Sequence, residues 1–99
     1  AEAGLGRIGC EVEPISDGVR VTAQLALPPT GGKETVVFEP GHSSVWVSDT
    51  IVSRTGRQLV ASADFVADDG GPVLLDRRAM VVTVLGQRTV VEIAGCPAP

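Results

Sequence analysis

The residues that could carry nucleophilic catalysis in this chain are few. His42 is the only histidine among the 99 residues, and Ser43 and Ser44 come directly after it in a Pro-Gly turn. Serine or cysteine catalysis needs a nucleophile, a base within hydrogen-bond reach and a third group that orients the base. Because adjacent side chains of one turn rarely point at each other, we interpret His42 as a surface loop residue. We predict no catalytic residues and no enzyme activity.

Metal and cofactor sites lack suitable residues in the same way. A zinc site takes three or four nitrogen or sulfur ligands, but the chain contains one histidine and two cysteines. Residues 4–9 match the dinucleotide pattern G-x-G-x-x-G, but the residues after them alternate like a strand, where the pattern requires a helix. We predict neither a metal nor a cofactor. Four aspartates surround one loop but lack the spacing of a calcium loop, namely Asp64, Asp68, Asp69 and Asp76.

Cys10 and Cys96 are the only cysteines and lie near the two ends of a short chain. This placement indicates a disulfide and an oxidising compartment, with two buried free thiols as the alternative. Across a loop of that length, chain-entropy models estimate a stabilisation of about 4–5 kcal/mol. The first residues resemble a mature chain after removal of an export signal, and without asparagine there is no N-glycosylation acceptor. We therefore expect an exported protein, in the bacterial periplasm or otherwise extracellular.

Charge and hydropathy exclude two classes of partner. Twelve acids against eight bases give a net charge of −4, whereas phosphate binding needs a concentrated basic surface. No apolar run approaches the ~18–20 residues of a membrane-spanning helix. We expect a monomer with no nucleic-acid partner and no membrane insertion. Arg54 with Arg57 and Arg77 with Arg78 form local basic pairs, which are either solvated surface or electrostatic docking points.

Short segments with alternating apolar and polar residues, separated by turns, predict an all-β protein. Seven to eight short strands at intervals of about ten residues are typical of an immunoglobulin- or fibronectin-like antiparallel β-sandwich, with a small closed barrel as the alternative. Residues 1–6 are expected to form a flexible lead-in and residues 7–99 a single domain. The expected strands cover residues 8–13, 19–27, 34–39, 44–52, 59–66, 73–75 and the two arms of a hairpin at 80–96.

Two of these segments carry more specific predictions. The hairpin at 80–96 is built around a Gly-Gln pair, and its arms are apolar on both faces, which favours a central position in a sheet. The segment 59–66 is rich in alanine and would also suit a helix. Its alternation and the turns that flank it favour a strand.

The segment 44–52 holds the only tryptophan. Its alternation places Val45, Val47 and Ile51 on one face and Trp46 on the other. We expect Trp46 in the core of the sandwich, with an exposed interaction anchor as the alternative. An edge strand can accept a further strand, and the acids near the third and fourth strands would either block or steer this addition; they are Glu34, Glu39 and Asp49.

The run Cys-Glu-Val-Glu-Pro-Ile-Ser-Asp-Gly-Val-Arg-Val at residues 10–21 resembles the start of the CsgH type in the CsgC/CsgH group of curli assembly chaperones. Length, strand count and the mature-looking start are similar as well. The Cys-x-Cys pair of CsgC is absent, so a redox role does not carry over. The resemblance implies a periplasmic protein that transiently engages disordered curlin-type subunits and inhibits their aggregation. The candidate partner-binding residues are Arg54, Arg57, Arg77, Arg78 and Trp46.

Two other functions stay open from the sequence. One is an immunoglobulin-like structural or adhesive module of a surface protein, which predicts self-association or a fixed partner interface. The other is a secreted enzyme inhibitor that inserts the loop at residues 40–44 into an active site, which predicts tight binding that salt does not weaken. The chaperone predicts weak, salt-sensitive binding.

Overall fold

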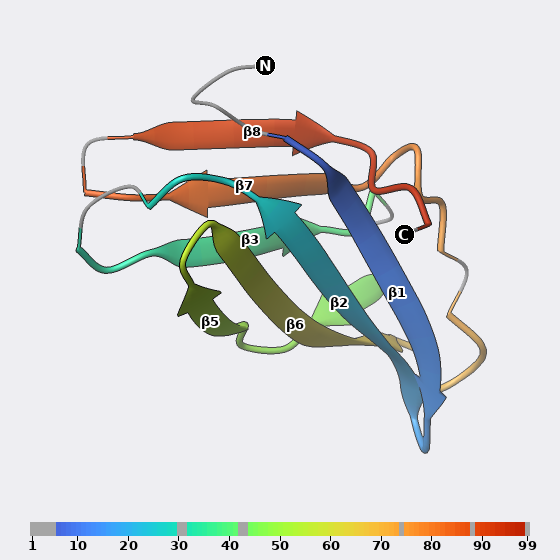
Figure 1. Cartoon of the computed structure of the whole chain (residues 1–99). Coiled ribbons are helices and arrows are strands. Elements are labelled where there is room, and N and C mark those ends of the chain that lie inside the picture. The colour runs from blue at the N-terminus through green and yellow to red at the C-terminus, as the bar shows by residue number, and fades with distance from the viewer. Residues whose placement is uncertain (1–5, 30–31, 42–43, 74, 88, 99) are drawn as a thin grey trace.

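The computed structural model describes residues 6–29, 32–41, 44–73, 75–87 and 89–98. Within these ranges the chain forms eight antiparallel strands and no helix (Figure 1). None of the described segments is a helix that could cross a membrane. The strands are β1 (Ile8–Ile15), β2 (Gly18–Ala26), β3 (Thr35–Glu39), β4 (Val45–Val47), β5 (Ile51–Thr55), β6 (Gln58–Ala67), β7 (Val81–Leu85) and β8 (Val90–Ala94).

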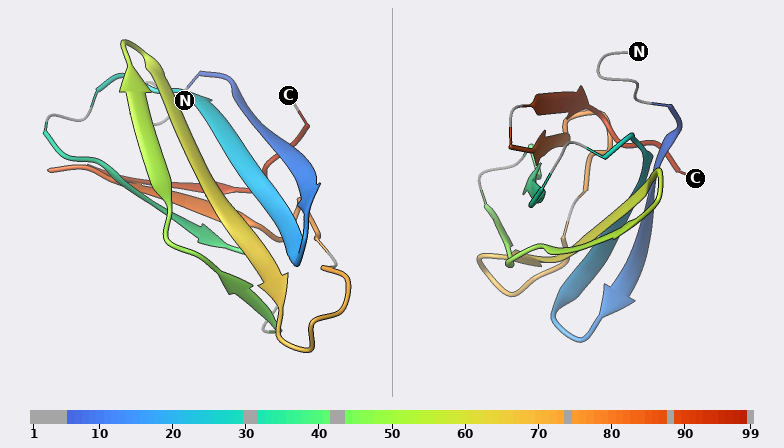
Figure 2. Two further views of the ribbon diagram at one scale, coloured as in Figure 1. Left: turned by 90° about the horizontal axis from the view of Figure 1, so that it is seen from below. Right: turned by 60° about the vertical axis from the view of Figure 1, so that its left-hand side comes forward.

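The strands form two sheets, which Figure 2 shows as two layers. One sheet has the order β1-β2-β6-β4, and β5 pairs with β6 on the same side as β4. The other sheet has the order β3-β7-β8. When β4 and β5 are taken as two parts of one interrupted strand, this is the strand order of a constant-type immunoglobulin domain. The predicted fold class is confirmed.

The inner faces of the two sheets share one hydrophobic core. Alternate residues of β2, β6 and β7 are buried, as a period of two requires. Phe38 of β3 and Phe65 of β6 meet edge to face across the layers, with 5.9 Å between ring centroids. Burying one such aromatic or branched side chain contributes about 1.5–3 kcal/mol. The strand assignment for residues 59–66 is therefore confirmed, because β6 supplies part of this core.

The final hairpin is present but is less central than predicted. β7 lies between β3 and β8, whereas β8 forms one edge of its sheet. Val90 of β8 is 69% exposed, so the apolar outer face of this strand is a surface and not a second buried layer. The hairpin connection is also longer than the predicted Gly-Gln pair, because Leu85 and Val90 are the last paired residues and leave residues 86–89 between the strands. Within this connection the Gly86 N–H donates to the Thr89 carbonyl at 2.8 Å.

The predicted strand at residues 44–52 is divided by a β-bulge. Val47 pairs with Phe65 and Ile51 pairs with Ser62, so the edge strand advances by four residues while β6 advances by three. One additional residue reverses the alternation from that point onward. The predicted grouping of Ile51 with Val45 and Val47 on one face is therefore wrong, because Val47 points inward whereas Ile51 points outward.

A short strand was predicted at residues 73–75, but the two described residues of this range, Val73 and Leu75, are not part of a strand. Val73 and Leu75 lie in the connection between β6 and β7 and pack against the core without strand pairing. Leu74 lies outside the described residues. The strand was predicted from the apolar side chains of this segment, and Val73 and Leu75 are apolar because they pack against the core.

Candidate strand-binding groove

The two sheets of this sandwich meet along two lateral seams, where an edge strand of one sheet faces an edge of the other. We call the side of β1 and the segment after β8 the closed seam, because covalent and hydrogen bonds join the sheets there. We call the side of β3 with β4 and β5 the open seam, because a groove separates the sheets there.

The closed seam contains the predicted disulfide between Cys10 of β1 and Cys96 beyond β8. The two Cα atoms are 5.6 Å apart, and both residues are buried. The Cys10 N–H donates to the Pro97 carbonyl at 2.7 Å, and the Cys96 N–H donates to the Arg77 carbonyl at 3.0 Å. Arg77 also donates from Nη1 to the carbonyls of Cys10, at 2.8 Å, and Cys96, at 3.2 Å. This arginine therefore holds the closed seam together.

The open seam contains a groove of about 820 Å³. Its lining has an apolar part, formed by inward residues of both sheets, and a polar rim. The apolar residues are Val36, Phe38, Val47 and Val52. The rim includes Lys33, Thr35, Ser48, Asp49 and Thr50.

Both sides of the groove are strand edges. Among the described residues, β3 pairs with β7 alone, and β4 and β5 pair with β6 alone. No backbone hydrogen bond between described residues joins β3 to β4 or β5. One edge of each strand therefore presents backbone N–H and C=O groups that an extended chain could pair with. Alternate side chains of such a chain would point toward the apolar lining.

One ion pair closes an end of the groove. Arg54 Nε donates to Glu34 Oε1 at 2.8 Å and Nη2 donates to Oε2 at 2.5 Å, in the bidentate geometry that arginine and carboxylate favour. Nη1 also donates to the carbonyls of Leu27 and, at 3.1 Å, Gly56. The side chains of Arg54 and Glu34 are only 20% and 6% exposed. Arg54 thus joins the end of β5 to the segment before β3, and the bulge is what turns it inward.

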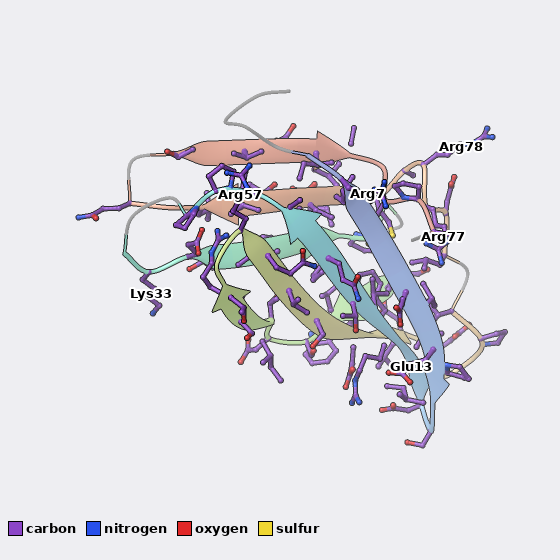
Figure 3. All side chains as sticks on the ribbon, viewed as in Figure 1. Arg7, Glu13, Lys33, Arg57, Arg77 and Arg78 are labelled. Atoms are coloured by element: carbon purple, nitrogen blue, oxygen red, sulfur yellow. A yellow bond between two sulfur atoms is a disulfide. The ribbon has the colours of Figure 1, made fainter. Side chains whose placement is uncertain are left out.

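The four predicted arginines do not form one patch. Arg54 and Arg77 make the structural contacts described above, while Arg57 and Arg78 are exposed. Figure 3 shows Arg57 on one side of the molecule and Arg77 and Arg78 on the opposite side. Only Arg57 and Arg78 are therefore presented to a partner by exposed side chains.

A basic end that the sequence did not reveal lies beside the groove. Arg7 and Arg57 border the end of β2, because their carbonyls accept from the N–H groups of Ala26 and Leu27, each at 2.9 Å. The exposed Lys33 lines the adjacent end of the groove (Figure 3). Figure 3 shows Arg7 beside β1 and away from Lys33, so Lys33 and Arg57 are the cations on the side of the groove. These two exposed cations come from separate segments, so the spacing of arginines along the chain could not identify them. We call Lys33 and Arg57 the basic end.

Trp46 is 60% exposed, so its predicted place in the core is wrong. It projects from the outer face of β4, opposite Val66, while its neighbours Val45 and Val47 point inward. The predicted alternation of residues 45–47 is confirmed, because Trp46 lies on the face opposite to Val45 and Val47. The alternation alone does not say which of the two faces the second sheet covers. The exposed position, which was the alternative, is the observed one.

The remaining candidates for chemistry add little to this surface. His42 and Ser43 lie outside the described residues. Of the acids near the β6–β7 connection, Asp69 Oδ1 accepts the Gly71 N–H at 2.8 Å and Asp76 Oδ1 accepts the Arg78 N–H at 3.0 Å, as in ordinary turns. No group of three or more potential metal ligands occurs among the described residues.

The features that a partner could contact are thus the groove of the open seam, the basic end and the exposed Trp46. These features comprise strand edges, exposed charges and one aromatic side chain. No protein-family model, no curated protein and no solved structure matches this chain.

Proposed function

We propose that this protein binds extended segments of unfolded or amyloid-forming secreted chains in the groove of the open seam and thereby inhibits their aggregation. The observation that carries the proposal is the pair of strand edges of β3 and β5, which have no strand partner within the described part of the chain and lie on either side of an apolar lining. Amyloid grows by adding extended strands edge to edge. A segment held between β3 and β5 would not offer the same backbone groups to a fibril.

The basic end supports a transient mode of binding. Lys33 and Arg57 would attract acidic segments toward the groove, and exposed charges act over about 8–10 Å at physiological salt. Such attraction speeds encounter more than it strengthens the complex. We therefore expect weak binding that salt weakens further, which agrees with the function that the curli-chaperone resemblance implies. The disulfide supports an exported location, and the periplasm suits this role.

The aggregation of a curlin-type subunit, followed by thioflavin fluorescence, tests this function. We expect a substoichiometric amount of the protein to lengthen the lag phase. Val37→Lys places a charge on exposed β3, where lysine blocks strand addition. We expect this variant to lose most of the lag extension while its melting temperature stays unchanged.

Val90→Lys is the matched control, because it makes the same change at an exposed position on β8, the other edge of the same sheet. It should keep the activity of the parent protein. An unchanged lag phase with the parent protein would rule out the chaperone function. Equal losses in both lysine variants would place the activity outside the groove.

An immunoglobulin-like adhesive or structural module is the second candidate, and the strand order favours it. Such a module would form a stable complex with itself or with one fixed partner. Sedimentation at micromolar concentrations separates the two functions. A stable dimer together with an unchanged aggregation lag would favour the adhesive module, and a monomer that delays aggregation would favour the chaperone.

A further inference from the structure

A second surface lies on the outer face of the sheet that contains β4, β5 and β6. Trp46 is 60% exposed and Ile51 is 74% exposed. Trp46 pairs with Val66 of β6 and Ile51 pairs with Ser62, so both side chains project outward at nearby positions along β6. Without the bulge Ile51 would point inward, so the bulge is what brings these two apolar groups to one face.

A fixed polar centre lies between the two apolar groups. The Ser48 N–H donates to the Asp64 carbonyl at 2.9 Å, and the Asp64 N–H donates to Ser48 Oγ at 2.8 Å. Arg20 donates from Nε to Asp64 Oδ1 at 2.8 Å. The hydrogen bond from Arg20 lowers the pKa of the Asp64 carboxyl, so the pair is ionised at neutral pH. Together with Ile51, these residues line a shallow depression of about 230 Å³.

The surroundings of this centre are acidic. Arg20 is the one base among the described outward residues of β1, β2, β4, β5 and β6, and Asp64 already binds it. Glu13, which is labelled in Figure 3, lies on β1 and pairs with Arg20 of β2. Glu11 is the next outward residue of β1. Asp49 is exposed at the rim of the depression. The face therefore carries four acids against one base.

We propose that this face, which we call the Trp46 face, is a second binding surface that takes a basic, partly apolar segment of another protein. Exposed tryptophan is the residue most typical of interaction hot spots, and its ring binds lysine and arginine through cation–π contacts. The surrounding acids attract a cationic chain and repel nucleic acids and anionic membranes. They also repel the same face of a second copy.

The Trp46 face is distinct from the groove although both use β4 and β5. The groove uses the inward residues Val47 and Val52, whereas the Trp46 face uses the outward residues Trp46 and Ile51. The two surfaces share Ser48 and Asp49, whereas their apolar contacts are made by different residues. The Trp46 face does not depend on the function proposed for the groove.

Trp46 reports on its own surface, because it is the only tryptophan of the chain. Titration of the whole protein with a tryptophan-free peptide of alternating lysine and valine should shift its emission to the blue and saturate. The same length of alternating glutamate and valine should leave the emission unchanged. Raised salt should weaken the binding of the lysine peptide, because the attraction is between exposed charges.

Two variants separate this surface from the groove. Ile51→Ser removes an exposed contact, so the fold should persist, and the lysine peptide should bind about tenfold more weakly. Val37→Lys alters the groove and should leave this titration unchanged. No emission shift with the lysine peptide, equal shifts with both peptides, or a shift with a neutral oligosaccharide alone would each overturn the proposal.

Discussion

The closed seam and the open seam differ in how strongly they connect the two sheets. At each seam an edge strand of one sheet lies next to an edge of the other. At the closed seam a disulfide and the Arg77 hydrogen bonds join the sheets. At the open seam the Arg54–Glu34 ion pair connects the two sheets at one end, and the groove lies beyond this ion pair. Strong joining on one side allows the other side to stay open without loss of the fold.

An open seam also exposes the protein to aggregation with itself, and its edges show the usual protections. β3 and β5 have five residues each and β4 has three, so each offers few backbone groups. The bulge after Val47 interrupts the pairing surface. Lys33 and Glu39 place charges at the two ends of β3. These devices limit long, stable pairing and are compatible with brief binding of another chain.

The largest expected effect comes from removing the bond of the closed seam. The double variant Cys10→Ser, Cys96→Ser should lose about 4 kcal/mol of unfolding free energy, because the unfolded chain regains the entropy of a long loop. For a domain of this size that corresponds to roughly 15–30 °C in melting temperature. Calorimetry of parent and variant measures the change.

The same variant sharpens the contrast between the seams. Well below its melting temperature it should still delay aggregation, whereas Val37→Lys should fold normally and fail to do so. If the serine variant melts like the parent protein, the closed seam does not hold the sheets together as described. If it is folded but inactive, the two seams are not independent.

An intermediate effect is expected at the end of the open seam. Arg54→Ala should lower the unfolding free energy by about 2 kcal/mol, because the nearly buried Glu34 carboxylate loses a charged bidentate partner. Arg54→Lys should retain only part of the unfolding free energy that Arg54→Ala loses, since lysine cannot form the bidentate pair. Denaturant unfolding of the three proteins measures the differences. Full recovery with lysine would show that charge alone, and not the bidentate geometry, matters.

The smallest effect belongs to an ion pair that lies in neither seam. The hydrogen bond and charge of Arg20 hold the pKa of Asp64 below its ordinary value of about 3.9. Since the lowered pKa belongs to the folded state, the stabilisation is present above pH ~4 and is lost as pH falls through the lowered pKa. Both side chains are well exposed, so the contribution is small.

Arg20→Gln measures this contribution by difference. Unfolding free energies of parent and variant should differ slightly at pH 6 and converge near pH 2. A difference that persists unchanged to pH 2 would show that Arg20 acts through packing and not through the charge of Asp64.

The sequence predicted those parts of the fold in which a residue pattern has a single physical explanation. In β2 and β6 the alternation is unbroken, because one face packs on the core and the other faces water. The disulfide was expected from two cysteines at the ends of a short chain. The alternation is a local property of each strand, and the disulfide follows from the number of cysteines. Neither prediction required knowledge of which strands are neighbours.

The parts that sequence did not predict depend on how strands assemble. The bulge after Val47 is set by the register of this edge strand against β6, and it decides that Ile51 is exposed and that the half-buried Arg54 points inward. The groove combines residues 32–38 with residues 47–54, which only the order of the sheets brings together. Arg77 appeared as part of a basic pair, and its contact with two carbonyls of the closed seam has no sequence signal.

The disulfide also decides how the domain responds to mechanical tension. It closes a covalent ring with a sequence separation of 86 residues, and its two ends are the points where the flanking segments leave the ring. A pull on those flanks would detach Ile8 and Gly9 from β2, and it would then be transmitted through the sulfur–sulfur bond without loading the rest of the two sheets. The ring can therefore not be drawn out to the roughly 290 Å that its extended backbone would span. With the disulfide formed, the domain can hardly be extended by force. After reduction of the disulfide, only the pairing and packing of the strands would resist extension.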